Sequence, residues 1–192
     1  MTETRQQRSE GDAAAPMRTA RLLLRRARPD DLDALHEILS DPRAMRYWSR
    51  PEHETLEESR AFLGHLLGCP GNGADDYILD LGGRAIGKAG SWAPPEVGFI
   101  LHPGHWGQGY MHEAMSALVP RLFARHAVPA LTADVDPRNA ASIALLRKLG
   151  FRQTGRAART LRWRDEWCDS VYFALPRPDR SSPCRRAAVR SP

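Results

Sequence analysis

The segment Glu96–Met111, EVGFILHPGHWGQGYM, constrains the fold of this chain more than any other. Residues 96–101 suit a strand, and from Gly109 onward apolar residues recur at helical spacing. Pro103 ends the strand, and glycines at 104, 107 and 109 form the connection. Glycine adopts positive φ readily and lets the backbone approach a ligand closely. The segment therefore predicts a strand that turns directly into a helix.

Such a turn is suited to binding an anion. The first turn of a helix leaves several backbone N–H groups without intrahelical partners, and the helix dipole adds partial positive charge there. Together they form a site for a phosphate or diphosphate that needs few basic side chains. The segment lacks the Gly-Lys-Ser/Thr of a P-loop, and its glycine spacing differs from the dinucleotide-binding fingerprint. A tight connection that binds nothing remains the alternative for this motif alone.

Other local patterns predict a mixed sheet covered by helices. Strands are predicted over residues 19–25, 76–81, 84–92, 96–101, 130–135, 151–154 and 170–175, and helices over 29–39, 55–67 and 109–125, with a last helix after Asp136-Pro137. Helical crossovers and hairpins both occur in this order. We therefore predict an α/β (α+β) fold with a mixed sheet.

Single residues refine these elements. Thr55 and Glu58 fit a capping box at the start of their helix, and the LGGR sequence at 81–84 fits a hairpin turn. Pro120 should kink its helix or end it early. Asp136, followed by proline, is expected to cap the last helix.

The composition predicts one cytoplasmic domain, over residues 18–176, between disordered tails at 1–17 and 177–192. Hydrophobic residues make up 42 % of the chain, as in globular proteins, and no apolar run approaches the ~20 residues of a membrane helix. The three cysteines, Cys69, Cys168 and Cys184, have no metal-ligand spacing and are expected to be reduced thiols. His102, His105 and His112 also lack the spacing of a metal site.

The charge is concentrated in the C-terminal tail. Its five arginines and one aspartate carry +4 of the formal net charge of +5, so the domain itself is nearly neutral. A near-neutral domain lacks the positive surface that a nucleic acid selects, which argues against a nucleic-acid partner. Binding of a nucleic acid or ribosome through the tail alone remains an alternative.

A second motif lies in residues 139–151, NAASIALLRKLGF, directly after the predicted strand 130–135. The ordered pair of motifs resembles the GNAT family of acyl-CoA N-acyltransferases, and within it the RimJ/RimL-like group, over roughly residues 19–175. The residues that carry the resemblance are Leu101, Pro103, Trp106, Gly107 and Gly109 in the first motif, Asn139, Ser142, Lys148, Gly150 and Phe151 in the second, and Trp167 and Asp169 near the C-terminus. Met111 departs from the family's small residue and could crowd the turn.

The resemblance implies the GNAT fold, with strands 96–101 and 130–135 splayed apart, and acetyl-CoA as co-substrate. Backbone groups of Phe99 and Leu101 would hold the pantetheine arm, and the Leu101 N–H would face the thioester oxygen. Asn139 would bind the arm from the other side. The pyrophosphate would be held by the N–H groups of Trp106, Gly107, Gln108, Gly109, Tyr110 and Met111. No metal is implied.

Two catalytic residues follow from the same resemblance. Glu96 stands where relatives carry a general base that acts through water, and an ordinary solvated carboxylate is the alternative. Leu146 replaces the tyrosine that commonly protonates the leaving thiolate, so Ser142 is the candidate for that step. A serine that bonds the backbone of its own helix is the alternative.

The acceptor is expected to be a primary amine. An α-amine of pKa about 7.7–8.0 is ~10–20 % neutral at pH 7, whereas a lysine is neutral in only ~0.04 % of molecules, so one carboxylate suffices for an N-terminal amine. A peptide N-terminus is therefore favoured, with a small-molecule amine next. Arg46–Trp48 and the segment 163–167 are candidate walls of its site. An acyl-CoA-binding module without transferase activity is the alternative, and a homodimer stays open.

Overall fold

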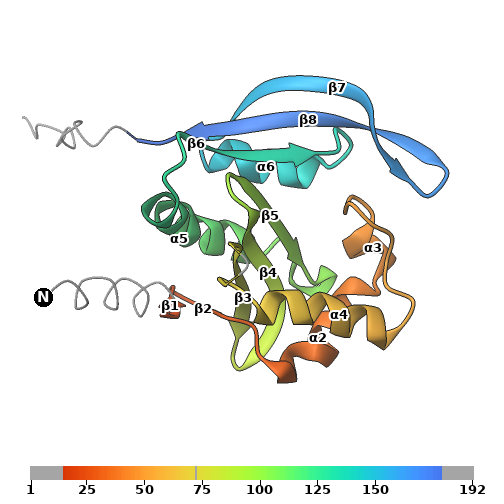
Figure 1. Ribbon diagram of the computed structural model, residues 1–192, viewed down its shortest axis with the longest axis vertical. Helices are drawn as coiled ribbons and strands as arrows, with labels where there is room; N and C mark the ends of the chain where they lie inside the picture. The colour runs from red at the N-terminus through yellow and green to blue at the C-terminus, as the bar shows by residue number, and fades with distance from the viewer. Residues whose placement is uncertain (1–14, 72, 179–192) are drawn as a thin grey trace, which may run out of the picture.

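The computed structural model describes residues 15–71 and 73–178. Its frame is one eight-stranded sheet in the order β1-β2-β3-β4-β5-β6-β8-β7 (Figure 1). The strands are β1 Met17–Arg18, β2 Leu23–Arg25, β3 Asp75–Leu81, β4 Arg84–Ala93, β5 Glu96–Leu101, β6 Ala130–Val135, β7 Arg152–Trp163 and β8 Glu166–Pro176. All neighbours are antiparallel except β5 and β6, which are parallel. The predicted mixed sheet is confirmed.

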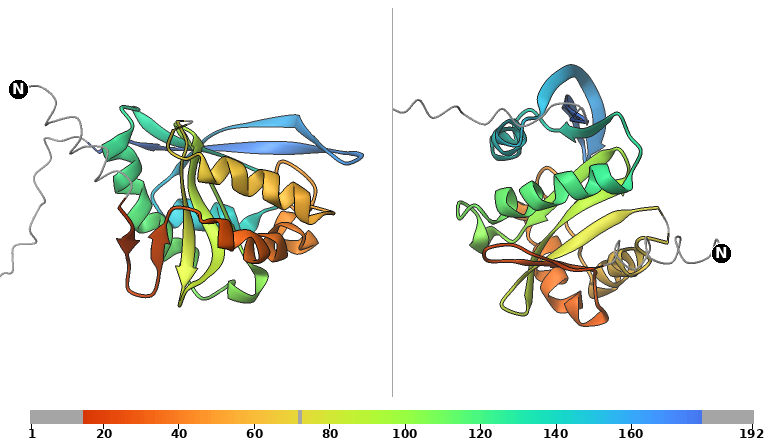
Figure 2. Two further views of the ribbon diagram at one scale, coloured as in Figure 1. Left: turned by 60° about the horizontal axis from the view of Figure 1, so that its bottom comes forward. Right: turned by 90° about the vertical axis from the view of Figure 1, so that its left-hand side faces the viewer.

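Helices cover both faces of this sheet. α2 Leu32–Leu39, α3 Pro42–Met45 and α4 Leu56–Leu67 pack on one face, and α5 Tyr110–Arg125 lies on the other (Figure 2). α6 Ala140–Lys148 adds Leu146 to the same core as α5. Successive side chains of β5 point to opposite faces of the sheet, so they belong to two hydrophobic cores. Ile100 packs with α2, α3 and α4 on one face, and Leu101 packs with α5 on the other. Short 3₁₀ helices, η1 Pro29–Asp31 and η2 Pro103–His105, precede α2 and α5.

Several local predictions are confirmed. Thr55 and Glu58 form the capping box of α4. Gly82 and Gly83 turn the β3–β4 hairpin with φ of 64° and 93°, a conformation that glycine adopts without strain. Within the described residues, no helix is long and apolar enough to cross a bilayer.

The N-terminal strand prediction is corrected to a hairpin. Residues 19–25 do not form one strand, because the Thr19 N–H donates to the Leu22 carbonyl at 2.9 Å and turns the chain between β1 and β2. α3 was not predicted, since four residues are too few to show helical periodicity. Its start is capped by Asp41, whose carboxylate accepts from the Arg43 N–H.

The structure also decides two details of the predicted helices. α5 does not end early at Pro120 but continues to Arg125, the predicted end, since buried Leu118, Leu122 and Phe123 hold it to the sheet on both sides of the proline. The last helix starts at Ala140 and is capped by Asn139, not by Asp136. The Asp136 carboxylate is instead engaged by Arg138, at 2.6 Å from its Nη2.

Met17 and Arg177, each one residue outside the predicted bounds of the domain, both contact it. Met17 belongs to β1. Arg177 donates from its backbone N–H to the Pro129 carbonyl at 2.8 Å and from Nε to the Val128 carbonyl at 2.9 Å. Its guanidinium also lies over the Phe123 ring. Of the predicted tails, residues 1–14 and 179–192 lie outside the described residues.

Candidate functional site

The turn between β5 and α5 is held by hydrogen bonds to its carbonyl groups. The Trp106 indole Nε1–H donates to the Leu101 carbonyl at 2.8 Å, and the Gln108 amide donates to the Gly104 carbonyl at 3.1 Å. Gly107 and Gly109 have φ of 72° and 81°, the left-handed region in which other residues are strained. Gly109 is the N-cap of α5. Gly107 and Gly109 are therefore required by the backbone path.

The N–H groups of this turn are open. From Gly107 to Met111, no backbone N–H donates to an acceptor among the residues that the structure describes. They stand at the start of a 16-residue helix, where the dipole adds positive character. A Cβ added at Gly107 would meet no other atom within 4 Å, so the space beside this residue is open. The turn therefore fits an anionic group such as a diphosphate.

Met111 does not crowd this turn with its side chain. The residue is only 8 % exposed and packs in the core between α5 and the sheet. Its departure from the family's small residue thus affects core packing, while its backbone N–H stays available at the helix start.

The edge of β5 beyond Glu96 is also open. His102 N–H donates to the Ile86 carbonyl at 2.8 Å, and Gly87 pairs with Leu101. Hydrogen-bonded pairs alternate along an antiparallel ladder, so the main-chain groups of Phe99 and Leu101 face away from β4, toward β6. On that side the ladder has one pair, Glu96 with Thr132. The Leu101 carbonyl accepts a hydrogen bond from the Trp106 indole, whereas the N–H of Leu101 remains open to a ligand.

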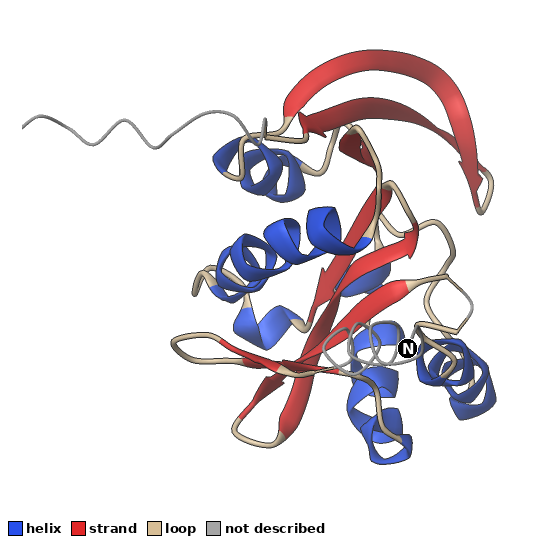
Figure 3. Cartoon of the chain, turned by 60° about the vertical axis from the view of Figure 1, so that its left-hand side comes forward, coloured by secondary structure: helices blue, strands red, loops and turns tan. Residues whose placement is uncertain are grey.

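A pocket of about 210 Å³ lies where Glu96 ends the paired part of β5. Its other lining residues come from the loop after α3, from the end of β6 and the residue that follows it, and from the β7–β8 hairpin. This hairpin is long and curved (Figure 3). It is lined by Arg46, Tyr47, Trp48, Ser49, Glu96, Asp134, Asp136, Thr160, Leu161, Trp163, Cys168, Asp169 and Ser170. The predicted walls Arg46–Trp48 and Trp163 thus meet Glu96, whereas Trp167 is 47 % exposed and does not line the pocket.

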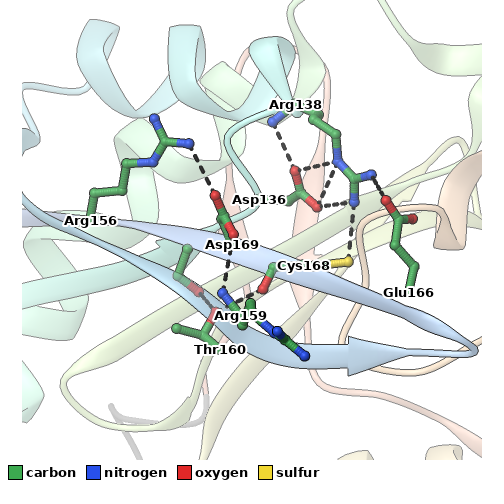
Figure 4. A network of polar contacts seen from close by, with 9 residues as sticks. Asp136, Arg138, Arg156, Arg159, Thr160, Glu166, Cys168 and Asp169 are labelled. Atoms are coloured by element: carbon green, nitrogen blue, oxygen red, sulfur yellow. Dashed lines mark hydrogen bonds and ion pairs between the residues drawn. The ribbon is translucent and has the colours of Figure 1, made fainter.

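Two of the pocket's carboxylates are neutralised by arginines (Figure 4). Arg138 lies between Asp136 and Glu166, with Nη1 at 2.7 Å from the Glu166 carboxylate. The Arg159 N–H and the Arg156 guanidinium both donate to Asp169 and lower the pKa of its carboxyl. Arg138 also donates to the Cys168 thiol at 3.1 Å.

Glu96 and Asp134 carry the remaining negative charge. Among the described residues neither forms an ion pair. Although Glu96 as a whole residue is exposed, partial desolvation of its carboxyl raises the pKa of Glu96, and the charge of Asp134 raises it further. A carboxylate that holds a proton more readily is suited to accepting one from an ammonium group. Asp134 was missed by sequence reasoning, although the alternation in ALTADV sets it on the same face as Thr132, the partner of Glu96.

Asn139 and Ser142 lie at the start of α6, outside the pocket lining. The Asn139 side-chain oxygen accepts from the Ser142 N–H at 3.1 Å, so this residue has a capping role. In the described part of the chain, the Ser142 hydroxyl has no hydrogen bond to its own helix, which was the alternative expected for it. Leu146 is fully buried, so its position supplies no acid.

Known proteins share this architecture. The family described as acetyltransferase (GNAT) domain matches residues 21–152, more than half of the chain. The uncharacterised N-acetyltransferase YnaD of Bacillus subtilis (strain 168) is 27 % identical over 162 residues, which cover 82 % of this chain and 94 % of that protein. An acetyltransferase of the GNAT family from Bacillus anthracis has a TM-score of 0.74 at 25 % identity, over 84 % of this chain and 98 % of that one. RimL, a ribosomal-protein α-N-acetyltransferase solved with coenzyme A, has a TM-score of 0.75 at 21 % identity, over the same shares. The chain therefore belongs to the GNAT family and is an N-acetyltransferase.

Proposed function

We propose that this enzyme transfers an acetyl group from acetyl-CoA to a primary amine, with the α-amine of a peptide N-terminus as the favoured acceptor. The observation that carries the proposal is the row of open N–H groups from Gly107 to Met111 beside the unpaired edge of β5, with an acidic pocket at the far end of that edge. The open N–H groups would bind a diphosphate, the unpaired edge of β5 would pair with an extended pantetheine arm, and the acidic pocket would bind a cationic amine.

The proposed roles follow from these groups. The N–H groups of residues 107–111, with Trp106 closing the turn, bind the diphosphate. The main chain of Phe99 and the N–H of Leu101 bind the pantetheine arm along the unpaired edge of β5, and Asn139 contacts it from the start of α6. Bound acetyl-CoA supplies the acetyl group as an activated thioester. The Leu101 N–H stabilises negative charge that develops on the thioester oxygen.

Glu96 is proposed as the general base. The carboxylates of Glu96 and Asp134 attract the ammonium form of the acceptor into the pocket, and Glu96 then accepts its proton through a water molecule. An α-amine needs little help, because ~10–20 % of it is already neutral at pH 7. Ser142, with its hydroxyl unengaged by the helix, is proposed to protonate the leaving thiolate.

A small-molecule amine is the second acceptor class. The pocket is small, at about 210 Å³, and aromatic side chains of Tyr47, Trp48 and Trp163 line it beside the carboxylates. Such a pocket would enclose one short amine chain. An acyl-CoA-binding module without transfer is the remaining alternative, favoured by the buried leucine at 146 in place of an acid.

Turnover with acetyl-CoA across peptide N-termini and small amines, measured as free thiol, tests the proposal. Glu96→Gln should lower kcat by about 10²- to 10⁴-fold while binding of coenzyme A is retained. The matched control is Glu57→Gln on α4, whose side chain is 80 % exposed and does not line the pocket. A wild type that binds coenzyme A but acetylates no amine would support the binding module. A wild type that does not bind coenzyme A would overturn the proposal.

A further inference from the structure

Arg21, in the turn between β1 and β2, is tied to the start of α5. Its Nη1–H donates to the Gln108 carbonyl at 2.9 Å, and its Nε–H donates to the Glu113 carboxylate at 2.7 Å. Its guanidinium lies over the Tyr110 ring, at 4.3 Å from the centroid. The side chain is 42 % exposed, so these contacts are not a by-product of core packing. They join two segments separated by 87 residues.

Glu113 holds Arg21 in this position. Its carboxylate accepts from the Arg21 backbone N–H at 2.7 Å and from the Thr19 hydroxyl at 2.5 Å, in addition to the guanidinium. Glu113 lies one helical turn into α5. The β1–β2 hairpin is therefore fixed to the helix whose first N–H groups form the open row.

The bond to the Gln108 carbonyl sets the direction of the next N–H. In a trans peptide the C=O and the following N–H point to opposite sides of the chain. Because the Gln108 carbonyl points to Arg21, the Gly109 N–H points away from the β1–β2 hairpin. That N–H has no acceptor within the described residues.

The glycine that follows it makes this peptide easy to rotate. Rotation of the Gln108–Gly109 peptide changes ψ of Gln108 and φ of Gly109, and Gly109 has a positive φ of 81°, a region from which glycine moves to other wells at little cost. Without a donor on the Gln108 carbonyl, the peptide could turn its oxygen toward an approaching anion and repel it.

We propose that Arg21 is a positioning residue that fixes the Gln108–Gly109 peptide with its N–H toward the diphosphate of the co-substrate. This inference rests on the proposed function. Arg21 acts through the peptide orientation and does not itself need to touch the ligand.

The test compares ligands with and without the diphosphate. Binding of coenzyme A and of pantetheine is measured by calorimetry for wild type, Arg21→Ala, Arg21→Lys and Arg18→Ala. Arg18 is the matched control, since it is an exposed arginine in the same hairpin and makes no hydrogen bond to α5 within the described residues. Arg21→Ala should weaken coenzyme A about 10- to 100-fold, as expected for a lost hydrogen bond to a charged group, and leave pantetheine unchanged. Arg21→Lys should restore part of the lost affinity for coenzyme A. Arg18→Ala should change that affinity only by the small effect of removing one positive charge.

Three outcomes would overturn the inference. Arg21→Ala could bind coenzyme A as the wild type does, or lose affinity for both ligands equally, which would indicate general damage. Arg18→Ala could weaken coenzyme A as much as Arg21→Ala, which would indicate charge alone. If Arg21→Ala does not fold, Glu113→Gln releases the same guanidinium and should give the same selective loss. Wild type that fails to bind coenzyme A would instead refute the proposed function.

Discussion

Lys88 and Asp76 form a buried ion pair between β4 and β3, and its loss should destabilise the enzyme strongly. Lys88 Nζ lies 2.8 Å from Asp76 Oδ1, and the two side chains are 4 % and 1 % exposed. The other oxygen of Asp76 has no hydrogen-bond partner within the described residues. Lys88 is thus the ion-pair partner on which this carboxylate depends. Replacement of Lys88 by methionine keeps most of the length of the side chain and leaves a buried charge unpaired.

The magnitude follows from that burial. Removal of one partner of a buried pair costs about 3–5 kcal/mol in the free energy of unfolding, far more than an exposed pair is worth. In a domain of this size, each kcal/mol shifts Tm by about 2–4 °C, so Lys88→Met should lower Tm by about 6–20 °C. Lys88 Nζ also lies 5.7 Å from the centroid of the Trp48 ring, a pocket wall, so acceptor binding should weaken as well.

Urea and thermal denaturation provide the assay. The control is Lys148→Met, the same substitution at the only other lysine of the sequence, which is exposed on α6 and should change stability by less than about 0.5 kcal/mol. Asp76→Asn should destabilise the wild type but stabilise Lys88→Met, because in that background it removes the unpaired charge. If Lys88→Met costs less than about 1 kcal/mol, or Asp76→Asn lowers stability equally in both backgrounds, the reasoning is refuted.

Two further predictions concern the active site. Asp134→Asn removes the second cause of the raised pKa of Glu96, so that pKa should fall and the acidic limb of the pH profile of kcat/KM should move to lower pH; an unchanged limb would mean that Glu96 is not the titrating base. Gly109→Ala should lower the free energy of unfolding by about 1–2 kcal/mol in urea, because φ is 81° although no atom lies closer than 3.5 Å to the new Cβ. Gly64→Ala, in mid-helix with nothing within 4 Å, should raise it by about 0.5–1 kcal/mol, and equal effects of the two alanines would contradict the backbone argument.

Most regular elements were predictable because their signals are local. Short strand-like runs bounded by turn residues predicted β3, β4 and β5, and a capping box and helical spacing predicted α4 and α5, nearly to the residue. The strand–turn–helix unit of residues 96–111 was predictable for the same reason, since Gly107 and Gly109 stand where the local backbone has a positive φ. Where local signals compete, the prediction was wrong. Asp136 and Asn139 are both residue types that cap helix N-termini. Asn139 caps α6, because the Asp136 carboxylate is paired with Arg138.

Only the tertiary structure decided how the site is assembled. The sheet order β6-β8-β7 brings Trp163 and Asp169 to Glu96, and no periodicity of any one segment contains that order. No local pattern predicts the contact between Arg21 and Gln108 either, because these residues lie 87 positions apart. Nor does a local pattern predict the ion pairs of the pocket, which leave Glu96 and Asp134 as its unneutralised carboxylates. The sequence by itself determined backbone conformations, because these depend on near neighbours along the chain. The contacts that give the pocket its charge depend on strand order and register, which arise only when distant segments pack against one another.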